Sequence, residues 1–164
     1  MNARDIMTRP PHTCGLETPL DEASRLMENE SCGTLPVLDD RGRLAGILTD
    51  RDIAIAIGRS DRAPAQITAR DVMTRNVHTC SPGDDLLEAL DEMASAGVRR
   101  LPVVDAAGKL RGLLSIDDII LWAVEHDDLK PKDVLRSLRA ICAAHNHMFE
   151  TEAIEFSPVS SNAD

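Results

Sequence analysis

A tandem repeat without gaps constrains this chain more than any other feature of its sequence. Residues 5–53 align with residues 71–119, and 21 of the 49 aligned positions are identical. Self-similarity of this kind identifies one structural unit that occurs twice in the chain. A segment without a counterpart follows the second copy. The fold must therefore be built from two equivalent halves and one addition at the C-terminal end.

The hydrophobic pattern predicts the same elements in both copies: strand, helix, strand, strand and helix. Short first strands are expected at 11–14 and 77–80. Thr18-Pro19 and Ser81-Pro82 place a hydroxyl before a proline, which predicts the start of the next helix there. Buried strands are expected at 35–38 and 101–104, hairpin turns at 39–42 and 105–108, return strands at 44–48 and 110–114, and second helices at 50–58 and 116–125. The proline of each buried strand is expected at a strand start or edge.

These elements predict an α+β fold in which two β-α-β-β-α repeats pack about a pseudo-twofold axis. A unit of about 50 residues cannot bury enough apolar surface alone. The second helices, around Ile53 and Ile119, are apolar almost all round, so we expect the repeat pair to bury part of them and a homodimer to bury the remainder. The expected division is repeat 1 at 1–60, a polar linker at 61–70, repeat 2 at 71–126, a C-terminal helical extension at 127–145 with its helix at 131–144, and a flexible tail at 146–164.

Composition excludes several classes of function. The formal net charge is −10, and the basic residues are scattered among acids, which is unlike the basic footprint of a nucleic-acid binder. The longest apolar run, at 119–124, is too short for a membrane span, and the first residues lack an apolar signal region. The 4 cysteines form no C-x-x-C pair, which favours free thiols in a reducing compartment. We therefore expect a cytoplasmic protein without a nucleic-acid or membrane partner.

The end of each return strand carries the motif of greatest interest. Thr49-x-x-Asp52 in the first copy corresponds to Ser115-x-x-Asp118 in the second. One interpretation is a capping box, in which the hydroxyl and the carboxylate satisfy backbone N–H groups at a helix start. The other is a ligand site, because a helix N-terminus favours phosphate and a carboxylate can accept both hydroxyls of a ribose. The same side chains can serve both purposes.

With its flanking residues, this motif resembles a known family. The run Asp-Ile-Met-Thr, followed by Leu-Pro-Val-Leu-Asp-x-x-Gly-x-Leu-x-Gly-Ile-Leu-Thr-x-x-Asp, is similar to a cystathionine-β-synthase (CBS) domain, and the second copy resembles it equally well. The resemblance covers residues 5 to about 125 and implies a CBS pair, or Bateman module, of the standalone bacterial type. Such modules are regulatory, commonly bind adenosine-containing ligands between their repeats, and often dimerise.

The resemblance also implies which residues contact a nucleotide. Thr49, Asp52, Ser115 and Asp118 are expected at ribose and phosphate. Arg51 favours an anion beside the first motif, whereas Asp117 disfavours one beside the second, so we expect the first cleft to be filled if a phosphate ligand fills only one. Further residues are implied because they immediately precede a buried strand or follow the Met-Thr pair of the opposite repeat: Thr34, Arg99, Arg100, Arg9, Pro10, Arg75, Asn76 and Val77.

Two other functions remain open on the residues alone. His-Thr-Cys occurs at 12–14 and again at 78–80, which permits a metal or redox sensor, although a cysteine on a strand is also a good small core residue. The apolar helices would equally suit a ligand-independent interaction module. No catalytic constellation and no metal site are predicted, so we expect no enzyme and no required cofactor. The ligand is expected to be AMP, ADP, ATP, NAD or S-adenosylmethionine, and the output to act on an unknown protein partner.

Overall fold

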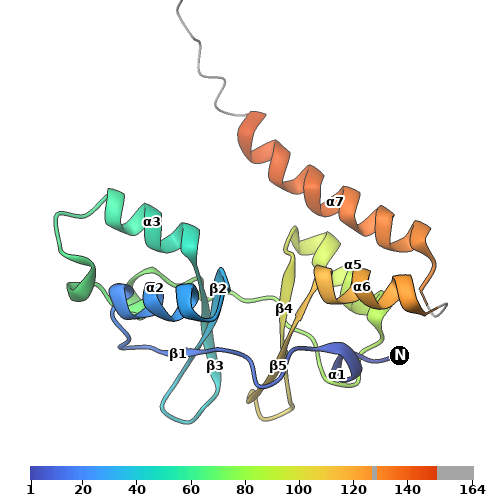
Figure 1. Cartoon of the computed structure of the whole chain (residues 1–164), viewed down its shortest axis with the longest axis horizontal. Coiled ribbons are helices and arrows are strands. Elements are labelled where there is room, and N and C mark those ends of the chain that lie inside the picture. The colour runs from blue at the N-terminus through green and yellow to red at the C-terminus, as the bar shows by residue number, and fades with distance from the viewer. Residues whose placement is uncertain (127–128, 151–164) are drawn as a thin grey trace, which may run out of the picture.

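The two repeats lie side by side, each with a small β-sheet and helices on one face (Figure 1). The computed structural model describes residues 1–126 and 129–150. In chain order the elements are α1 (Ala3–Ile6), β1 (Cys14–Gly15), α2 (Leu20–Asn29), β2 (Thr34–Leu38), β3 (Leu44–Thr49), α3 (Asp50–Gly58), the 3₁₀ turn η1 (Pro64–Gln66), α4 (Ala69–Val72), α5 (Leu86–Ala96), β4 (Arg100–Val104), β5 (Leu110–Ser115), α6 (Ile116–Glu125) and α7 (Pro131–Glu150). The predicted α+β pair with a C-terminal helix is confirmed.

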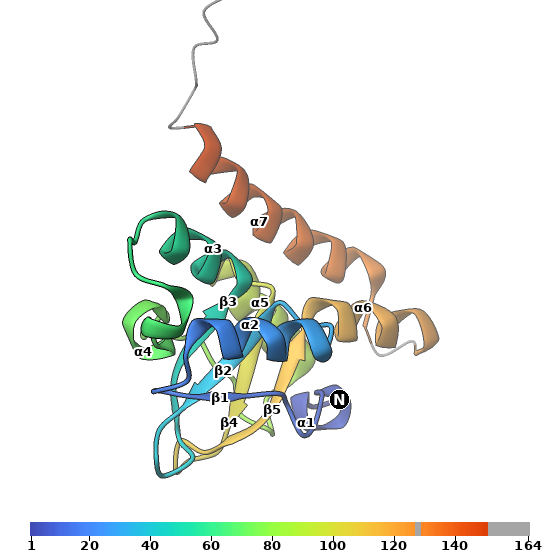
Figure 2. The same cartoon turned by 60° about the vertical axis from the view of Figure 1, so that its left-hand side comes forward.

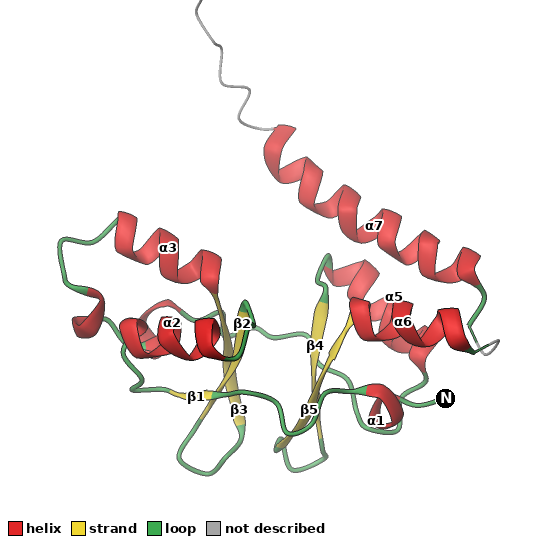
Figure 3. Ribbon diagram, viewed as in Figure 1, coloured by secondary structure: helices red, strands yellow, loops and turns green. Residues whose placement is uncertain are grey.

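The sheets repeat one plan with one difference. In the first repeat the strand order is β1-β2-β3, with β1 parallel to β2 and β2 antiparallel to β3. In the second repeat β4 and β5 form the equivalent antiparallel pair. The predicted first strands at 11–14 and 77–80 are too long: β1 has 2 residues, and its counterpart is the single bridge between Cys80 and Val103. The chain is nearly all loop before the first long helix of each repeat (Figure 3).

The prolines of the central strands do not sit at a strand start, although β4, in a two-stranded sheet, is an edge strand as expected. Pro36 is the third residue of β2, and Pro102 is the third residue of β4. Their missing N–H groups cost little because the neighbouring segment begins to pair only at this point. Cys80 N–H donates to the Pro102 carbonyl at 3.1 Å, and Val104 N–H, two residues on, donates back to the Cys80 carbonyl at 2.9 Å. Before that position no neighbouring segment requires a backbone N–H donor from this side of the strand.

The helices α2 and α5 begin later than the hydroxyl-proline pairs predicted. The N-cap of α2 is Pro19 itself, and the N-cap of α5 is Asp85, four residues after Ser81. The Thr18 hydroxyl instead accepts the Gly15 N–H at 3.0 Å, closing a turn ahead of the helix. Asp85 accepts the Leu87 N–H at 2.9 Å and is the better cap because its carboxylate complements the helix dipole.

The opening helices are exchanged between the repeats, which the sequence analysis did not predict. Ala3 and Met7 belong to the core of the second repeat, whereas Ala69 and Met73 belong to the core of the first. The linker therefore contains buried residues as well as polar ones. Each exchanged segment then runs along a return strand: Thr8 N–H donates to the Leu113 carbonyl at 2.9 Å. This exchange joins the two cores through the backbone.

Glycine is required where the exchanged segments cross the return strands. A Cβ on Gly46 would lie 2.6 Å from the Met73 sulfur and 2.8 Å from the Thr74 carbonyl oxygen. A Cβ on Gly112 would lie 3.0 Å from the Thr8 carbonyl oxygen and would also overlap the Met7 side chain. Both glycines belong to the repeated motif, so the motif encodes the crossing of the segments as well as the helix cap.

The helix α7 lies across the second repeat and packs on α5 and α6 (Figure 2). Its buried face includes Val134 and Ile141, which belong to the core of that repeat. The helix is longer than the predicted 131–144. The predicted flexible tail begins at 146, within α7, and its residues 151–164 lie outside the described part of the chain. None of the described helices is both long enough and apolar enough to span a membrane.

The second helices are buried in part, with Ile53 and Ile119 in the cores, while apolar residues on the outer faces of α3 and α6 stay exposed. Ile55 and Ile57 on α3 are each 41% exposed, and Leu121 and Val124 on α6 are 69% and 81% exposed. The contact between the repeats is made by strands and crossing segments instead, so these helix faces point to solvent in the single chain.

Candidate functional site

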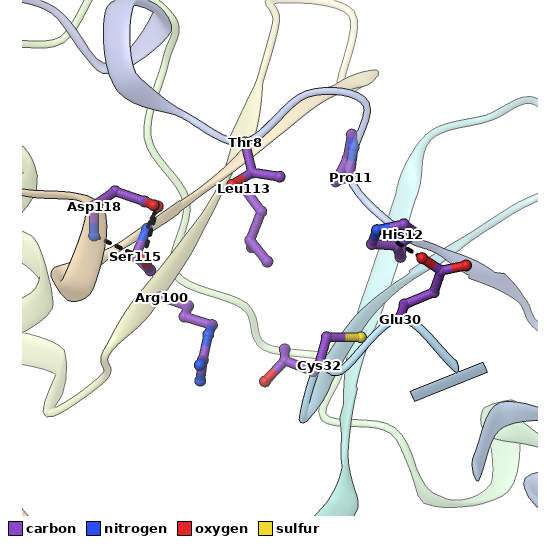
Figure 4. A pocket seen from close by; sticks show the side chains of 10 residues that line it. Thr8, Pro11, His12, Glu30, Cys32, Arg100, Leu113, Ser115 and Asp118 are labelled. Carbon is purple, nitrogen blue, oxygen red and sulfur yellow. Dashed lines mark hydrogen bonds and ion pairs between the residues drawn. The ribbon is translucent and has the colours of Figure 1, made fainter. Parts of the chain in front are cut away.

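A cleft of about 240 Å³ lies between the two repeats, where β2, β5 and the chain after α1 meet. Residues of both repeats line it (Figure 4): Thr8, Pro11, His12, Glu30, Cys32, Thr34, Arg100, Leu113, Ser115 and Asp118. The repeat architecture explains this convergence. Because β2 and β4 are equivalent strands at the centre of the pair, Thr34 and Arg100, their first residues, come to the same cleft.

Ser115 and Asp118 form one rigid unit in this cleft. The Ser115 N–H and hydroxyl both donate to Asp118 Oδ2, at 2.9 and 2.6 Å, and the Asp118 N–H donates to the Ser115 hydroxyl oxygen at 3.0 Å. The predicted capping box is confirmed. Both hydrogen bonds that the carboxylate accepts use Oδ2, so Oδ1 accepts none from the described residues and is available to a ligand.

The charges in the cleft are nearly balanced, although the chain as a whole is acidic. Asp118 and Glu30 supply negative charge, and Arg100 supplies a positive guanidinium. His12 Nε2 lies 3.4 Å from a Glu30 carboxylate oxygen, so that carboxylate has a partner within the cleft. Arg100 makes no hydrogen bond or ion pair with any other described side chain, so its guanidinium can bind an anion. The cleft can therefore accept a ligand that carries both hydroxyls and a phosphate.

The structure brings together four of the residues predicted for a nucleotide: Thr34, Arg100, Ser115 and Asp118. Arg99 is not among the residues that line the cleft, and it contributes its carbonyl, which accepts the Ile116 N–H at 2.9 Å. Arg9 and Pro10 are exposed on the segment that enters the cleft, joined by a cis peptide bond. Their neighbours Thr8 and Pro11 line the cleft instead.

The remaining predicted residues lie elsewhere. Thr49 and Asp52 form the equivalent capping box at the start of α3, with the Thr49 hydroxyl 2.6 Å from Asp52 Oδ2. Arg51 is exposed beside it. Arg75, Asn76 and Val77 line a separate, shallower hollow with residues of the two hairpins: Leu44, Ala45, Thr79, Val104 and Gly108. That hollow does not include Thr49 or Asp52.

Six of the residues that line the cleft were not predicted from the sequence. Thr8 and Leu113 are brought in by the crossing of the exchanged segment, and Glu30 and Cys32 by the loop after α2. Thr8 belongs to the repeated Met-Thr pair, so the sequence repeat could have identified it as a candidate. Glu30 and Cys32 have no counterpart of the same type in the other copy, so the repeat pattern could not identify them. The other two are Pro11 and His12.

The cysteines of the two His-Thr-Cys sequences, Cys14 and Cys80, are core residues. Burial raises the pKa of Cys14 to about 11 and that of Cys80 to about 12, with nearby acids adding to the effect. Both thiols are buried in the cores, as predicted for small core residues. Among the side chains that the structure describes, which end at Ala144, no cluster of three or more His, Cys, Asp and Glu could hold a metal ion.

The chain matches a family model and several characterised relatives. The model described as "CBS domain" matches residues 3–59 and 69–125. The chain is 34% identical over 121 residues to the CBS domain-containing protein YhcV of Bacillus subtilis, covering 72% of this chain and 82% of the relative. It is 30% identical over 141 residues to hypoxic response protein 1 of Mycobacterium tuberculosis, covering 86% and 94%.

Other relatives are matched over only part of their length. The chain spans 57% of an uncharacterised Methanopyrus kandleri protein at 32% identity. It spans 22% of the inosine-5′-monophosphate dehydrogenase of Nitrosopumilus maritimus, also at 32% identity. The relatives matched over most of their length are thus small CBS proteins, and the enzymes share only their CBS part with this chain.

Solved structures agree with this assignment. The CBS domain pair of protein MJ0100, in complex with 5′-methylthioadenosine and S-adenosyl-L-methionine, matches with a TM-score of 0.69 at 28% identity, over 77% of this chain and 98% of that one. CBSX2 in complex with AMP matches with a TM-score of 0.66 at 28% identity, over 76% and 96%. Hypoxic response protein 1 with two coordinated zinc ions matches with a TM-score of 0.67 at 31% identity, over 74% and 98%. Taken with the duplicated motif and the exchanged opening helices, these matches show that the chain belongs to the CBS domain family, as a tandem CBS pair.

Proposed function

We propose that this chain is a regulatory module that binds a small adenosine-containing ligand in the cleft lined by Thr34, Arg100, Ser115 and Asp118. The observation that carries the proposal is the convergence of ligand-type groups from both repeats on one cleft. A ligand there contacts both halves of the module and can alter how they are arranged. Relatives of the same fold, solved with AMP or with S-adenosyl-L-methionine and 5′-methylthioadenosine, support this ligand class.

Each group has a role that follows from its chemistry. Asp118, held by Ser115, has an oxygen that can accept a ribose hydroxyl. The Arg100 guanidinium is suited to a phosphate, because its planar fork matches phosphate oxygens. The apolar surfaces of Pro11 and Leu113 can contact the base. None of the described residues that line the cleft is a Phe, Tyr or Trp, so the proposed base contact is with aliphatic side chains.

The size and charge of the cleft favour a nucleoside monophosphate. Its volume of about 240 Å³ is slightly below the usual range of small-molecule pockets, which begins at about 300 Å³. Arg100 is the one arginine among its lining residues, and Asp118 and Glu30 disfavour additional anionic groups. We therefore place AMP ahead of ATP or NAD. This assignment reverses the preference from the sequence, which favoured Thr49, Arg51 and Asp52.

The output of such a module acts on another molecule. We propose a homodimer formed through the exposed apolar faces of α3 and α6, which would bury Ile55, Leu121 and Val124. A ligand shifts the dimer toward one arrangement if it binds that arrangement more tightly, and an unknown protein partner reads the change. No catalytic activity is proposed for the chain itself, since His12 pairs with Glu30 and the Ser115 hydroxyl donates to Asp118, so the histidine activates neither Ser115 nor another described nucleophile.

A nucleotide panel in thermal unfolding tests the proposal. AMP at 100 times its Kd should add about 2.7 kcal/mol to the free energy of unfolding. Asp118→Asn should abolish most of the AMP effect, whereas Asp52→Asn, which alters the equivalent cap in the other repeat, should retain it. An absence of stabilisation by AMP, ADP, ATP, NAD and S-adenosylmethionine would contradict the proposal and favour a ligand-independent interaction module.

A further inference from the structure

The helix α7 lies close to the segment that carries Arg100 into the cleft. α5 ends at Gly97, which has a φ of +64°, and a Cβ there would lie only 2.8 Å from the Ala144 Cβ of α7. Arg100 follows three residues later and lines the cleft. Three residues of extended chain span about 10 Å. One short segment therefore has α7 at one end and the ligand site at the other.

This segment is fixed at each of its residues. The Gly97 and Val98 N–H groups both donate to the Met93 carbonyl at the end of α5, the latter at 3.0 Å. The Arg99 carbonyl accepts the N–H of Ile116, the first residue of α6, at 2.9 Å. Displacement of Gly97 would therefore act on Arg100 directly and, through Arg99, on the start of α6. Both Ser115 and Asp118 belong to that helix start.

α7 holds its position on α5 through its own buried contacts. Val134 is 5% exposed and Ile141 is fully buried in the core of the second repeat. The Arg136 guanidinium also approaches the Asp91 carboxylate of α5 at 3.7 Å. Because these contacts fix the helix along its length, Ala144 meets Gly97 in a defined place.

From these contacts we infer that α7 is a positioning element of the cleft, which holds the Arg100 segment and the start of α6 in their ligand-binding arrangement. The inference rests on the proposed function for its ligand. Its structural part is independent of any ligand, since it concerns the order of the cleft wall. By reciprocity, a ligand in the cleft must also stabilise the docked state of α7. A molecule that contacts α7 can therefore change the affinity of the cleft for its ligand, and the ligand can change how that molecule binds.

Gly97→Asn tests the contact, because Asn tolerates a positive φ and its Cβ would push against Ala144. Gly42→Asn is the matched control, since Gly42 has a φ of +72° and no atom within 4 Å of the place of its Cβ. Amide hydrogen exchange of the full chain without ligand is measured over 98–101 and 115–119. We expect exchange there to accelerate about 5-fold or more in Gly97→Asn and not in Gly42→Asn. Gly97→Asn/Ala144→Gly should restore it.

AMP binding by titration calorimetry provides the second readout. Gly97→Asn should weaken AMP binding about 5-fold or more, and the double variant should restore it. If Gly97→Asn proves too unstable, Ala144→Val enlarges the same contact from the α7 side and should give the same pattern. Unchanged exchange over 98–101 and 115–119 would overturn the inference. Accelerated and restorable exchange in a protein that does not bind AMP would support α7 as a positioning element and contradict only the proposed ligand.

Discussion

The helices α2 and α5 hold equivalent places in a duplicated chain, yet they differ along one stripe of their surface. At four equivalent positions the first repeat has polar residues and the second has apolar or small ones: Asp21, Ser24, Glu28 and Ser31 against Leu87, Leu90, Ala94 and Gly97. These positions recur at helical spacing and form one stripe. In the second repeat α7 packs on that helix. The duplication thus preserved the fold while the second copy acquired a surface for an added helix.

The difference extends to the cleft. Thr34 and Arg100 are equivalent residues, each opposite the hydroxyl residue of its own motif: Thr34 pairs with Thr49, and Arg100 with Ser115. Only the second repeat combines an arginine at this place with a helix that fixes the preceding segment. Two sites built on one plan can therefore differ in charge and in rigidity. Substitutions at equivalent positions of the two repeats should distinguish the contacts that both repeats make from those that only one makes.

The largest expected effect comes from making α5 resemble α2. Leu90→Ser removes a side chain that is 1% exposed and places a hydroxyl in the core, so we expect a loss of about 3–5 kcal/mol in the free energy of unfolding. Ser24→Ala, at the equivalent position of α2, should change it by less than about 1 kcal/mol. Urea denaturation measures both. Similar losses in the two variants would show that the helices are covered alike.

The glycines of the two motifs should behave alike. Gly46→Ala and Gly112→Ala each place a Cβ against a backbone carbonyl oxygen, at 2.8 Å from Thr74 and 3.0 Å from Thr8, respectively. We expect each to destabilise the fold by about 1–3 kcal/mol, as overpacking does. Gly58→Ala is the control, because no atom lies within 4 Å of the place of its Cβ. A neutral result at either motif glycine would mean that the exchanged segment is free to move away.

The aspartates of the capping boxes should be alike in stability and different in binding. Asp52→Asn and Asp118→Asn each weaken one cap and should each cost about 1 kcal/mol in urea denaturation. AMP affinity, measured by calorimetry, should fall about 10-fold or more for Asp118→Asn alone, because hydrogen bonds to a charged group contribute about 1.5–3 kcal/mol. Equal losses of affinity in both variants would indicate that both clefts bind AMP.

The smallest effect is expected from the buried thiols. The pKa values of Cys14 and Cys80 rise from 9.0 to about 11 and about 12 in the folded protein. A raised pKa stabilises the fold below pH 9, and this contribution is lost as the pH rises toward those values. The free energy of unfolding should therefore fall above pH 9. In the Cys14→Ala/Cys80→Ala variant the free energy of unfolding should fall less above pH 9 than in the wild type. The same pH profile in both proteins would contradict the burial of both thiols.

Reactivity with a thiol reagent at pH 8 gives a second check on these cysteines. Cys142 is exposed on α7 and should react rapidly in the native protein. Cys14 and Cys80 should react only after unfolding, because both are buried and remain protonated.

The sequence predicted the elements that depend on local pattern. The central hairpins, the helices α3 and α6, and the capping boxes follow from repeated apolar runs and from the Thr49/Asp52 and Ser115/Asp118 spacing. The exchange of α1 and α4 could not be predicted in this way. Ala3 and Ala69 occupy equivalent positions in the two repeats, and either core could have accepted either helix. Only the tertiary structure decides which core a short segment joins.

The composition of the cleft was predictable to a similar extent. Thr34, Arg100, Ser115 and Asp118 were expected from the motif and its resemblance to CBS domains. Their meeting in one cleft was not, because it depends on how the two sheets face each other. Glu30 lies in a loop after a helix, where neither periodicity nor repetition marks a residue. Side chains contributed by such loops are identified by three-dimensional proximity alone.

A structure of the protein with AMP tests the central claim most directly. We predict electron density for AMP in the cleft between the repeats, with a ribose hydroxyl on Asp118, the phosphate near Arg100 and the base against Leu113. AMP bound instead at Thr49 and Asp52, with the Ser115 and Asp118 cleft unfilled, would contradict the assignment of the ligand to this cleft.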